Sequence, residues 1–185
     1  MIEWLASLDM SVLQSLYAAR SDTFVQILMS VSTVGDTATV IVLAAVLAFI
    51  FYIYKRHAEM AGLVTAVIGT ASVTYVLKHL VQRARPDALY QAYAETGYSF
   101  PSGHASASAA LYGFLAFLAW RNLKPGINRT ALATLAIAFA LLISFSRLYL
   151  GVHYLSDVVA GSIVGMFFAW LGSKVTRTIR NPAAS

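Results

Sequence analysis

The sequence predicts an all-α integral membrane protein, a bundle of six helices in a single domain over residues 1–185. The first observation behind this prediction is composition: 59% of the residues are hydrophobic and only 11% are charged, whereas a soluble domain carries about 25% charged residues. A soluble fold of this size leaves about 30% of the surface of its unfolded chain in water. Because so many of the residues are hydrophobic, much of that exposed surface would be apolar, and we expect lipid to cover it. The second observation is a series of charge-free stretches, and the third is the placement of the basic residues between them.

Leucine and valine recur at helical spacing near the N-terminus: Leu5, Leu8, Val12 and Leu16 alternate with Ser7, Asp9, Ser11 and Ser15. This pattern predicts an amphipathic helix that lies in the membrane interface. The next apolar stretch, Thr23–Val34, is short. It either crosses the membrane as a sixth helix or enters only partway, and we favour the crossing.

Five longer stretches without charge predict membrane-spanning helices: Thr37–Tyr54, Met60–Leu77, Ala105–Trp120, Ala131–Ser146 and Val158–Ser173. Each is near the lower end of the roughly 17–25 residues that a span requires, and flanking residues can extend it. Small residues are frequent in these stretches, and they let membrane helices approach closely. We therefore interpret Gly161 and Gly165 as packing positions within the bundle and not as a dimerisation motif.

The charged residues indicate how the spans are oriented. Three basic groups fall on one face if the five spans alternate, and they hold 8 of the 13 basic residues: Lys55 and Arg56; Arg121, Lys124 and Arg129; Lys174, Arg177 and Arg180. Because basic loops stay in the cytoplasm, this face is expected to be cytoplasmic. Lys78, Arg85 and Arg147 fall at the outer face, against this rule, and require another explanation.

Other classes of protein are disfavoured. The net charge of +5 comes from basic residues scattered between apolar runs, which fits juxtamembrane positions better than a nucleic-acid partner. The chain has no cysteine, so disulfides and thiolate metal sites are impossible, although the redox compartment stays open. Met1–Trp4 lacks the basic region of a cleavable signal peptide. No His-x2–4-His spacing occurs, so a zinc site is not expected.

Three short segments at helix ends meet on the outer face: Lys78–Pro86, Pro101–His104 and Ser146–Asp157. Together they supply what phosphoryl transfer requires, which is fixed donors around three charged oxygens. Lys78, Arg85 and Arg147 are three cations, and the planar guanidinium of arginine can hold two oxygens at once. Ser102 and Gly103 open a helix whose free N–H groups favour an anion.

The same segments supply a nucleophile and an acid. His153 and Asp157 are four residues apart, so on a helix they share a face. Asp157 can accept from one imidazole nitrogen and leave the other free to attack phosphorus. His104 has Ser108 in the equivalent position and is therefore the better general acid. The expected cycle forms a phosphohistidine at His153 and then releases it to water, with no metal or cofactor.

These segments resemble the motifs of the type 2 phosphatidic acid phosphatase family, which also includes soluble acid phosphatases and vanadium haloperoxidases. Lys78 to Pro86 fits Lys-x6-Arg-Pro, Pro101 to His104 is Pro-Ser-Gly-His, and Ser146 to Asp157 fits Ser-Arg-x5-His-x3-Asp. All three motifs are intact and in order over the central half of the chain. The resemblance implies that eight residues carry the roles given above: Lys78, Arg85, Ser102, Gly103, His104, Arg147, His153 and Asp157.

The resemblance also implies a six-helix fold in a bacterial inner membrane with an extracytoplasmic site. Membrane-bound bacterial members act on phosphatidylglycerol phosphate, phosphatidate or undecaprenyl diphosphate. We therefore predict a metal-independent phosphatase that hydrolyses a phosphate monoester or a terminal diphosphate of a membrane lipid. Its expected partners are the lipid and the phosphate product. The sequence leaves open which lipid it is, and it leaves the oligomeric state open.

Two other functions would also use a lipid-phosphate or phosphate-like site. A transporter or flippase would bind a lipid phosphate without cutting it, but the charge-free spans lack the ionisable residues that favour transport. A haloperoxidase-like relative would bind vanadate, but the apolar spans argue against it. We interpret Arg83 as a helix-end arginine that extends to lipid headgroups, His57 as solvated in a cytoplasmic loop, and His79 as structural. The aromatic residues among Tyr90–Phe100 form either an interfacial belt or the entry for a headgroup.

Overall fold

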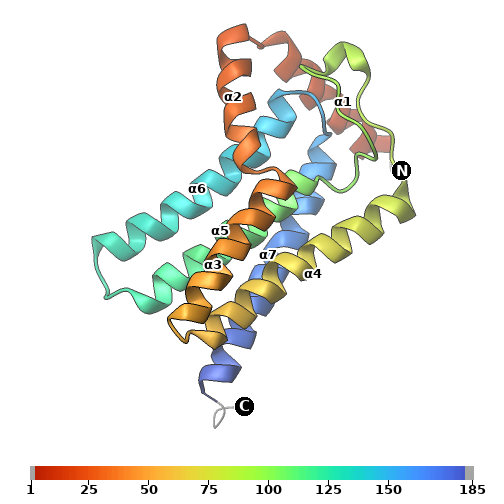
Figure 1. Cartoon of the computed structure of the whole chain (residues 1–185). Helices are drawn as coiled ribbons and strands as arrows, with labels where there is room; N and C mark the ends of the chain where they lie inside the picture. Colours follow the sequence, from red (N-terminus) through yellow and green to blue (C-terminus); the bar gives the residue numbers. More distant parts are fainter. Residues whose placement is uncertain (1–2, 182–185) are drawn as a thin grey trace.

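The computed structural model describes residues 3–181 and contains helices but no strand within that range. The elements in chain order are α1 (Glu3–Ala18), α2 (Asp22–Val34), α3 (Thr37–Ile53), α4 (His57–Val81), the short 3₁₀ helix η1 (Ala88–Tyr90), α5 (Gly103–Asn122), α6 (Ile127–Tyr149) and α7 (Leu155–Arg180). Figure 1 shows α3 to α7 packed as a bundle with α1 and α2 at one end. The predicted all-α class is confirmed.

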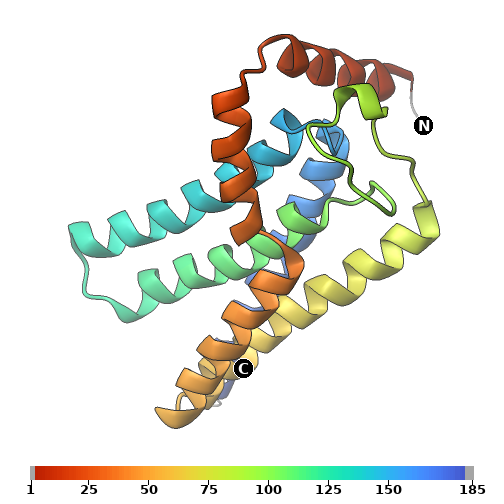
Figure 2. The same ribbon diagram turned by 45° about the horizontal axis from the view of Figure 1, so that its top comes forward.

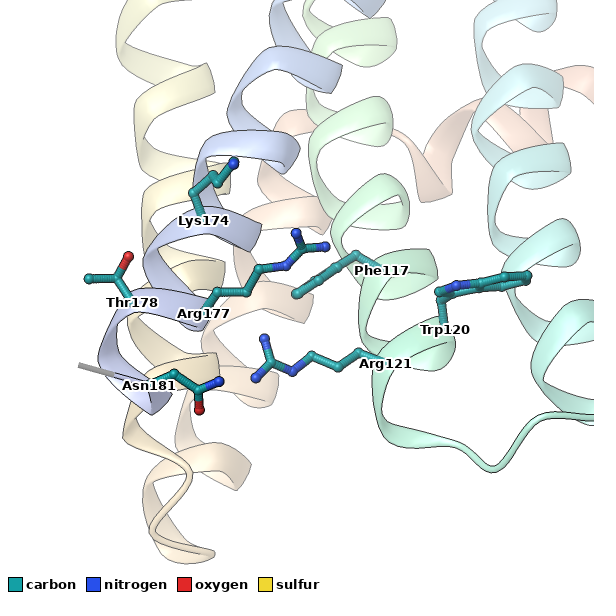
Figure 3. A pocket seen from close by; sticks show the side chains of 7 residues that line it. All are labelled: Phe117, Trp120, Arg121, Lys174, Arg177, Thr178 and Asn181. Atoms are coloured by element: carbon teal, nitrogen blue, oxygen red, sulfur yellow. The ribbon is translucent and has the colours of Figure 1, made fainter. Parts of the chain in front are cut away.

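The two ends of the bundle differ. The residue 82–102 segment and the α6–α7 connection lie at one end, and α1 lies across it (Figure 2). The α3–α4 turn and the last turns of α7 lie at the other end (Figure 1). This second end carries the three basic groups identified in the sequence, and Figure 3 shows part of it. We call the first the site end and the second the basic end.

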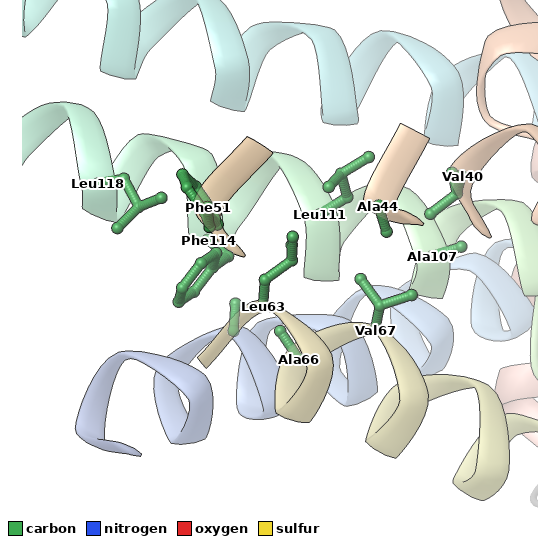
Figure 4. Packing of buried hydrophobic residues seen from close by; sticks show 11 residues of the cluster. Val40, Ala44, Phe51, Leu63, Ala66, Val67, Ala107, Leu111, Phe114 and Leu118 are labelled. Atoms are coloured by element: carbon green, nitrogen blue, oxygen red, sulfur yellow. The ribbon is translucent and has the colours of Figure 1, made fainter. Parts of the chain in front are cut away.

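The core lies between α3, α4, α5 and α7. Figure 4 shows Val40 of α3, Leu63 of α4, and Leu111 and Phe114 of α5 packed against one another. All four are at most 1% exposed. Helix α5 is at the centre of this packing, and its run from residue 105 to residue 111 is buried throughout. Its many alanines and serines are explained by this position, because neighbouring helices leave little room for larger side chains.

Glycines set the closest helix contacts. A Cβ atom on Gly172 of α7 would lie 2.3 Å from the carbonyl oxygen of Gly62 in α4. A Cβ atom on Gly161 would lie 2.5 Å from the carbonyl oxygen of Ser102, which caps α5. A Cβ atom on Gly165 would lie 2.3 Å from the carbonyl oxygen of Ser106 in α5. Gly161 and Gly165 therefore pack within one chain, as the sequence indicated.

Each charge-free stretch of the sequence lies within one helix, Tyr54 excepted, which caps α3. By length and composition, α4, α6 and α7 can cross a membrane, and α2 with α3 forms a fourth candidate that is bent by 44°. Helix α2 has 13 residues, about 20 Å at 1.5 Å per residue, which is short of the ~30 Å hydrocarbon core. Helix α5 is not among these candidates, and its run from residue 105 to residue 111 is buried within the bundle. The count of six spans stays a prediction.

Helix α1 forms where the sequence predicted an amphipathic helix, but one of its polar residues has a different position from the one expected. Asp9 is 1% exposed, although it was assigned to the polar face. Its carboxylate accepts hydrogen bonds from the Ser156 amide at 2.9 Å and the Ser156 hydroxyl at 2.6 Å. Asp9 therefore fastens α1 to the first turn of α7.

Candidate active site

The structure brings the three predicted segments together at the site end. Lys78 lies in the last turn of α4, and the chain then leaves the helix through Gln82, whose φ of 49° is left-handed. Ser102 caps the start of α5, and Arg147 lies in the last turn of α6. His153 precedes α7 and Asp157 lies in its first turn. Helix ends thus supply all the predicted residues except Arg85 and His153, which lie in connecting segments.

His153 is held through both ring nitrogens. Its Nε2 lies 3.2 Å from Nη1 of Arg85, and its Nδ1 lies 3.5 Å from Oδ2 of Asp157 and 3.4 Å from the hydroxyl of Ser99. A guanidinium has only donors, so Nε2 is the acceptor and the ring proton is on Nδ1, facing Asp157. This tautomer leaves the lone pair of Nε2 directed at the cationic side of the site.

The imidazole of His153 is kept neutral. Burial lowers the pKa of His153 to about 4, and the positive charges of Arg147 and Arg85 act in the same direction. The hydrogen bond and negative charge of Asp157 oppose this without overcoming it. Near neutral pH Nε2 is therefore unprotonated, as a nucleophile requires.

Asp157 is fully buried and accepts from several donors. The hydroxyl of Ser99 and the amide of Tyr154, at 2.9 Å, donate to Oδ2. Arg83 donates to Oδ1 at 2.6 Å. These contacts hold the carboxylate ionised and fixed beside His153.

The interpretation of Arg83 as an arginine that extends to lipid headgroups is wrong. Besides Asp157, its guanidinium donates to Asp9 at 2.8 Å and to the hydroxyl of Ser156 at 2.7 Å. It also lies over the ring of Tyr154, 4.2 Å from the ring centroid. The sequence held a signal for this, because Arg83 is a further basic residue at the face where lysine and arginine are disfavoured.

Arg147 is fully buried and is held by residues from two other parts of the chain. It donates to the hydroxyl of Ser32 in α2 at 2.6 Å, to the hydroxyl of Tyr93, and to the carboxylate of Glu95. Tyr93 donates in turn to Glu95 at 2.8 Å. Burial raises the pKa of Glu95, but Arg147 and the Tyr93 hydroxyl outweigh it and lower the pKa to about 2. Glu95 is therefore an anion held on a predicted phosphate-binding cation.

His104 has a carboxylate neighbour that the sequence did not reveal. Its Nε2 lies 3.8 Å from Oδ2 of Asp36, the residue that caps α3 by accepting from the Ala38 amide at 2.8 Å. His104, Asp36, Tyr93, Glu95 and Ser32 line one cavity of about 450 Å³. Spacing along the chain gave His104 no acidic partner, whereas packing of α3 beside α5 supplies one.

The remaining predicted residues frame the same site. The hydroxyl of Ser102 is buried and caps α5, and its amide donates to the carbonyl oxygen of Asp157 at 3.0 Å. Lys78 donates to the carbonyl oxygen of Tyr98 at 2.6 Å. A Cβ atom on Gly103 would lie 3.5 Å from the Thr37 hydroxyl, an ordinary contact distance. Ser102 is structural in this state, whereas Gly103 and Lys78 line a groove between α3 and α4.

The model of the PAP2 superfamily matches residues 59–180 of this chain. The chain belongs to the PAP2 superfamily. It is 27% identical over 168 residues to phosphatidylglycerophosphatase B of Bacillus subtilis, covering 89% of this chain and 81% of the relative. It is 30% identical over 188 residues to lipid A 4'-phosphatase of Bacteroides thetaiotaomicron, covering 92% and 78%.

The fold is also that of a solved PAP2 protein. The crystal structure of a transmembrane PAP2-type phosphatidylglycerolphosphate phosphatase from Bacillus subtilis superposes with a TM-score of 0.84 at 23% identity, covering 94% of this chain and 87% of the other. The chain is therefore an integral membrane member of a family of lipid phosphate hydrolases.

The range matched by the PAP2 model contains all eight predicted site residues, but residues outside this range also contact the site. Asp9, Ser32 and Asp36 lie before residue 59 and contact Arg83, Arg147 and His104. Three N-terminal helices thus complete the surroundings of residues that the PAP2 motifs supply. No local spacing could have shown this, because each contact joins helices that are distant in sequence.

Proposed function

We propose that this PAP2 protein hydrolyses a phosphate monoester, or the terminal phosphate of a diphosphate, on a membrane lipid through a phosphohistidine at His153. The observation that carries the proposal is the arrangement around this ring. Nδ1 faces Asp157 at 3.5 Å while Nε2 faces Arg85 at 3.2 Å. A neutral nucleophile thus points at a guanidinium, a group suited to hold the oxygens of the phosphoryl group that the nucleophile attacks.

The first step forms the bond between Nε2 of His153 and phosphorus while the bond from phosphorus to the lipid oxygen breaks. His104 gives its proton to that oxygen. In the second step a water molecule attacks phosphorus, the nitrogen–phosphorus bond breaks, and His104 takes a proton from the water. Lys78, Arg85 and Arg147, with the backbone N–H groups at the start of α5, stabilise the equatorial oxygens in both steps.

The lipid part of the proposal rests on a second cavity. A groove of about 620 Å³ begins at Lys78 and Gly103 and continues between α3 and α4. Apolar side chains line it, among them Ile41 and Ile68, which are 45% and 55% exposed at the surface of the bundle. A phosphate bound at Lys78 could therefore keep its hydrocarbon chain in this groove, in contact with the bilayer.

The setting in the membrane completes the proposal. The site end faces the outside and the basic end faces the cytoplasm, because the basic end carries most of the lysines and arginines. In a bacterial cell the protein lies in the inner membrane. Relatives named for phosphatidylglycerophosphate and for lipid A support a phosphorylated lipid as the class of substrate.

The test is phosphate release by the detergent-purified protein from phosphatidylglycerol phosphate, phosphatidate and undecaprenyl diphosphate. We expect turnover on at least one lipid and its loss in His153→Ala. With p-nitrophenyl phosphate, whose leaving group needs no proton, His104→Ala should accumulate acid-labile, base-stable phosphoenzyme. A His57→Ala variant is the control, because His57 lies at the basic end. Binding of all three lipids without any phosphate release would instead support the transporter.

A further inference from the structure

A second cavity with the chemistry of an anion site lies at the basic end, between α5 and α7. Its volume is about 570 Å³. Its lining residues are Phe117, Trp120, Arg121, Lys174, Arg177, Thr178 and Asn181. Figure 3 shows Arg121 of α5 and Arg177 of α7 extending toward each other into the space between the two helices. This cavity shares no lining residue with the site end.

The cations of this cavity have no acidic partner among the described residues. The nearby arginines Arg56 and Arg180 both bind Glu59, at 2.9 and 3.1 Å. Glu59, at the start of α4, is the acidic side chain of the basic end. The other seven of the eight Asp and Glu residues lie in α1, at the starts of α2, α3 and α7, and in the residue 82–102 segment: Glu3, Asp9, Asp22, Asp36, Asp87, Glu95 and Asp157. Arg121, Lys174 and Arg177 are therefore three positive charges around one space, and none of them is paired with an acidic side chain within residues 3–181.

Ordinary helix electrostatics account for only part of this charge. Basic residues are favoured at helix C-termini, where each macrodipole is equivalent to about half a negative charge. Helices α5 and α7 both end here, so their dipoles balance about one of the three cations. An excess of about two positive charges remains, and like charges facing each other across a gap repel. A bound anion relieves that repulsion.

The walls of the cavity indicate which kind of anion fits. Arg177 lies over the ring of Phe117, 5.3 Å from its centroid, which holds the guanidinium beside an apolar surface. Trp120 also lines the cavity and is 52% exposed; it points away from Phe117 (Figure 3), and Arg129 lies over its ring at 4.0 Å. Thr178 and Asn181 add neutral polar groups beside the cations. The cavity therefore offers positive charge to a phosphate and polar groups to the rest of a lipid headgroup. It also offers aromatic surface to the first methylene groups of the acyl chains.

We propose that this cavity binds the phosphate-bearing headgroup of an anionic phospholipid in the leaflet opposite the active site. Arg121 and Arg177 hold the phosphate from two helices, Lys174 adds charge, and Phe117 and Trp120 contact the upper part of the acyl chains. The bound lipid joins α5, which carries His104, to α7, which follows His153. The proposal does not depend on the chemistry at the site end.

The test measures binding and not turnover. Native mass spectrometry of the full chain in detergent would count bound phosphatidylglycerol and, with the same acyl chains, bound phosphatidylcholine. Phosphatidylglycerol is a phosphodiester and so lacks the terminal phosphate that the proposed reaction cleaves. The double variant Arg121→Gln/Arg177→Gln should lower the affinity for phosphatidylglycerol about 100-fold, the loss expected for two charge-assisted hydrogen bonds to a phosphate. The matched control is Lys55→Gln/Lys124→Gln, which removes the same charge from the same end outside the cavity. It should change the affinity less than about threefold, because salt screens exposed charges that do not contact the lipid.

Three results would overturn the proposal. One is equal binding of both lipids to the wild-type chain. Another is the same loss in both double variants, which would indicate general attraction by the basic end. The third is displacement of the lipid by millimolar glycerol 1-phosphate, which would show that the cavity takes soluble phosphates. An unchanged unfolding temperature of the Arg121→Gln/Arg177→Gln variant in detergent without added lipid would exclude misfolding as the cause of its loss.

Discussion

Glu95 accepts a hydrogen bond from the guanidinium of Arg147, a residue with no exposed surface. It also lies 3.7 Å from Nη2 of Arg85. A carboxylate of the chain thus occupies two of the cations that the proposed mechanism gives to the phosphoryl group. Carboxylate and phosphate oxygens suit the same guanidinium donors, so the substrate must displace Glu95 to bind as proposed.

This competition predicts the effect of Glu95→Gln. The amide keeps the shape of the side chain but removes the charge that holds it on Arg147, so phosphate gains access to the arginines. The inhibition constant of inorganic phosphate should fall at least about fivefold, because even an exposed ion pair contributes up to about 1 kcal/mol and this pair is largely buried. Asp87→Asn is the control, because Asp87 is exposed in the same segment and caps η1 through an interaction that asparagine keeps. An unchanged inhibition constant in Glu95→Gln would show that Glu95 does not compete.

The buried network of Arg83 predicts a coupled loss of stability. Arg83→Met leaves the carboxylates of Asp9 and Asp157 without their cation, and breaking a buried pair in this way costs about 3–5 kcal/mol. In the double variant Arg83→Met/Asp9→Asn one of those two charges is also gone. The double variant should therefore unfold no more easily than Arg83→Met alone, measured by unfolding in detergent. Strict additivity of the two changes would contradict the network.

The depressed pKa of His153 predicts how stability varies with pH. In the unfolded chain the imidazole titrates near its ordinary pKa of about 6.5, whereas burial lowers the pKa of His153 in the folded protein to about 4. The unfolded chain therefore binds a proton first as the pH falls. The folded state should lose up to roughly 3 kcal/mol between pH 6.5 and pH 4, at 1.36 kcal/mol per unit.

The comparison with His153→Gln isolates this contribution. The variant has no titrating ring at this position, and every other group titrates in both proteins. The difference in unfolding temperature between the two proteins should shift in favour of His153→Gln as the pH is lowered through this window. If the two curves stay parallel from pH 7 to pH 4, His153 is not buried as a neutral ring.

The groove between α3 and α4 predicts that a substitution in it changes the KM for lipid substrates and leaves the KM for soluble substrates unchanged. Ala71→Trp fills the groove with an indole, so the KM for a lipid phosphate should rise at least about tenfold, as expected when a large side chain blocks a contact worth a few methylenes. The KM for p-nitrophenyl phosphate should be unchanged, because this substrate has no chain to place. Leu135→Trp on α6, which is 64% exposed and outside the groove, serves as the control. If Ala71→Trp raised the KM of both substrates equally, the hydrocarbon chain of the lipid would not lie in this groove.

Much of this fold follows from local sequence. Charge-free runs gave α4, α6 and α7, and motif spacing predicted that Lys78, His104 and His153 would meet at one end. The N-terminal contributions did not follow, because Asp9, Ser32 and Asp36 reach the site through helix packing that no spacing rule describes. The interpretation of Arg83 failed for a related reason, because its partners come from α1 and α7. The local sequence around an arginine at a helix end does not show whether its side chain contacts lipid headgroups or a buried carboxylate.

The backbone contact between α5 and α7 has a consequence for how this enzyme family could change its substrates. Gly161 and Gly165 let α7 lie directly on the main chain of Ser102 and Ser106, and the Ser102 amide bonds to the carbonyl oxygen of Asp157. The separation of the two histidines is thereby set by main-chain atoms, which side-chain substitutions leave in place. Exposed positions of the residue 83–100 segment, such as Ala88, Leu89 and Thr96, can then change for a new headgroup while Arg85, Ser99 and the two histidines keep their places.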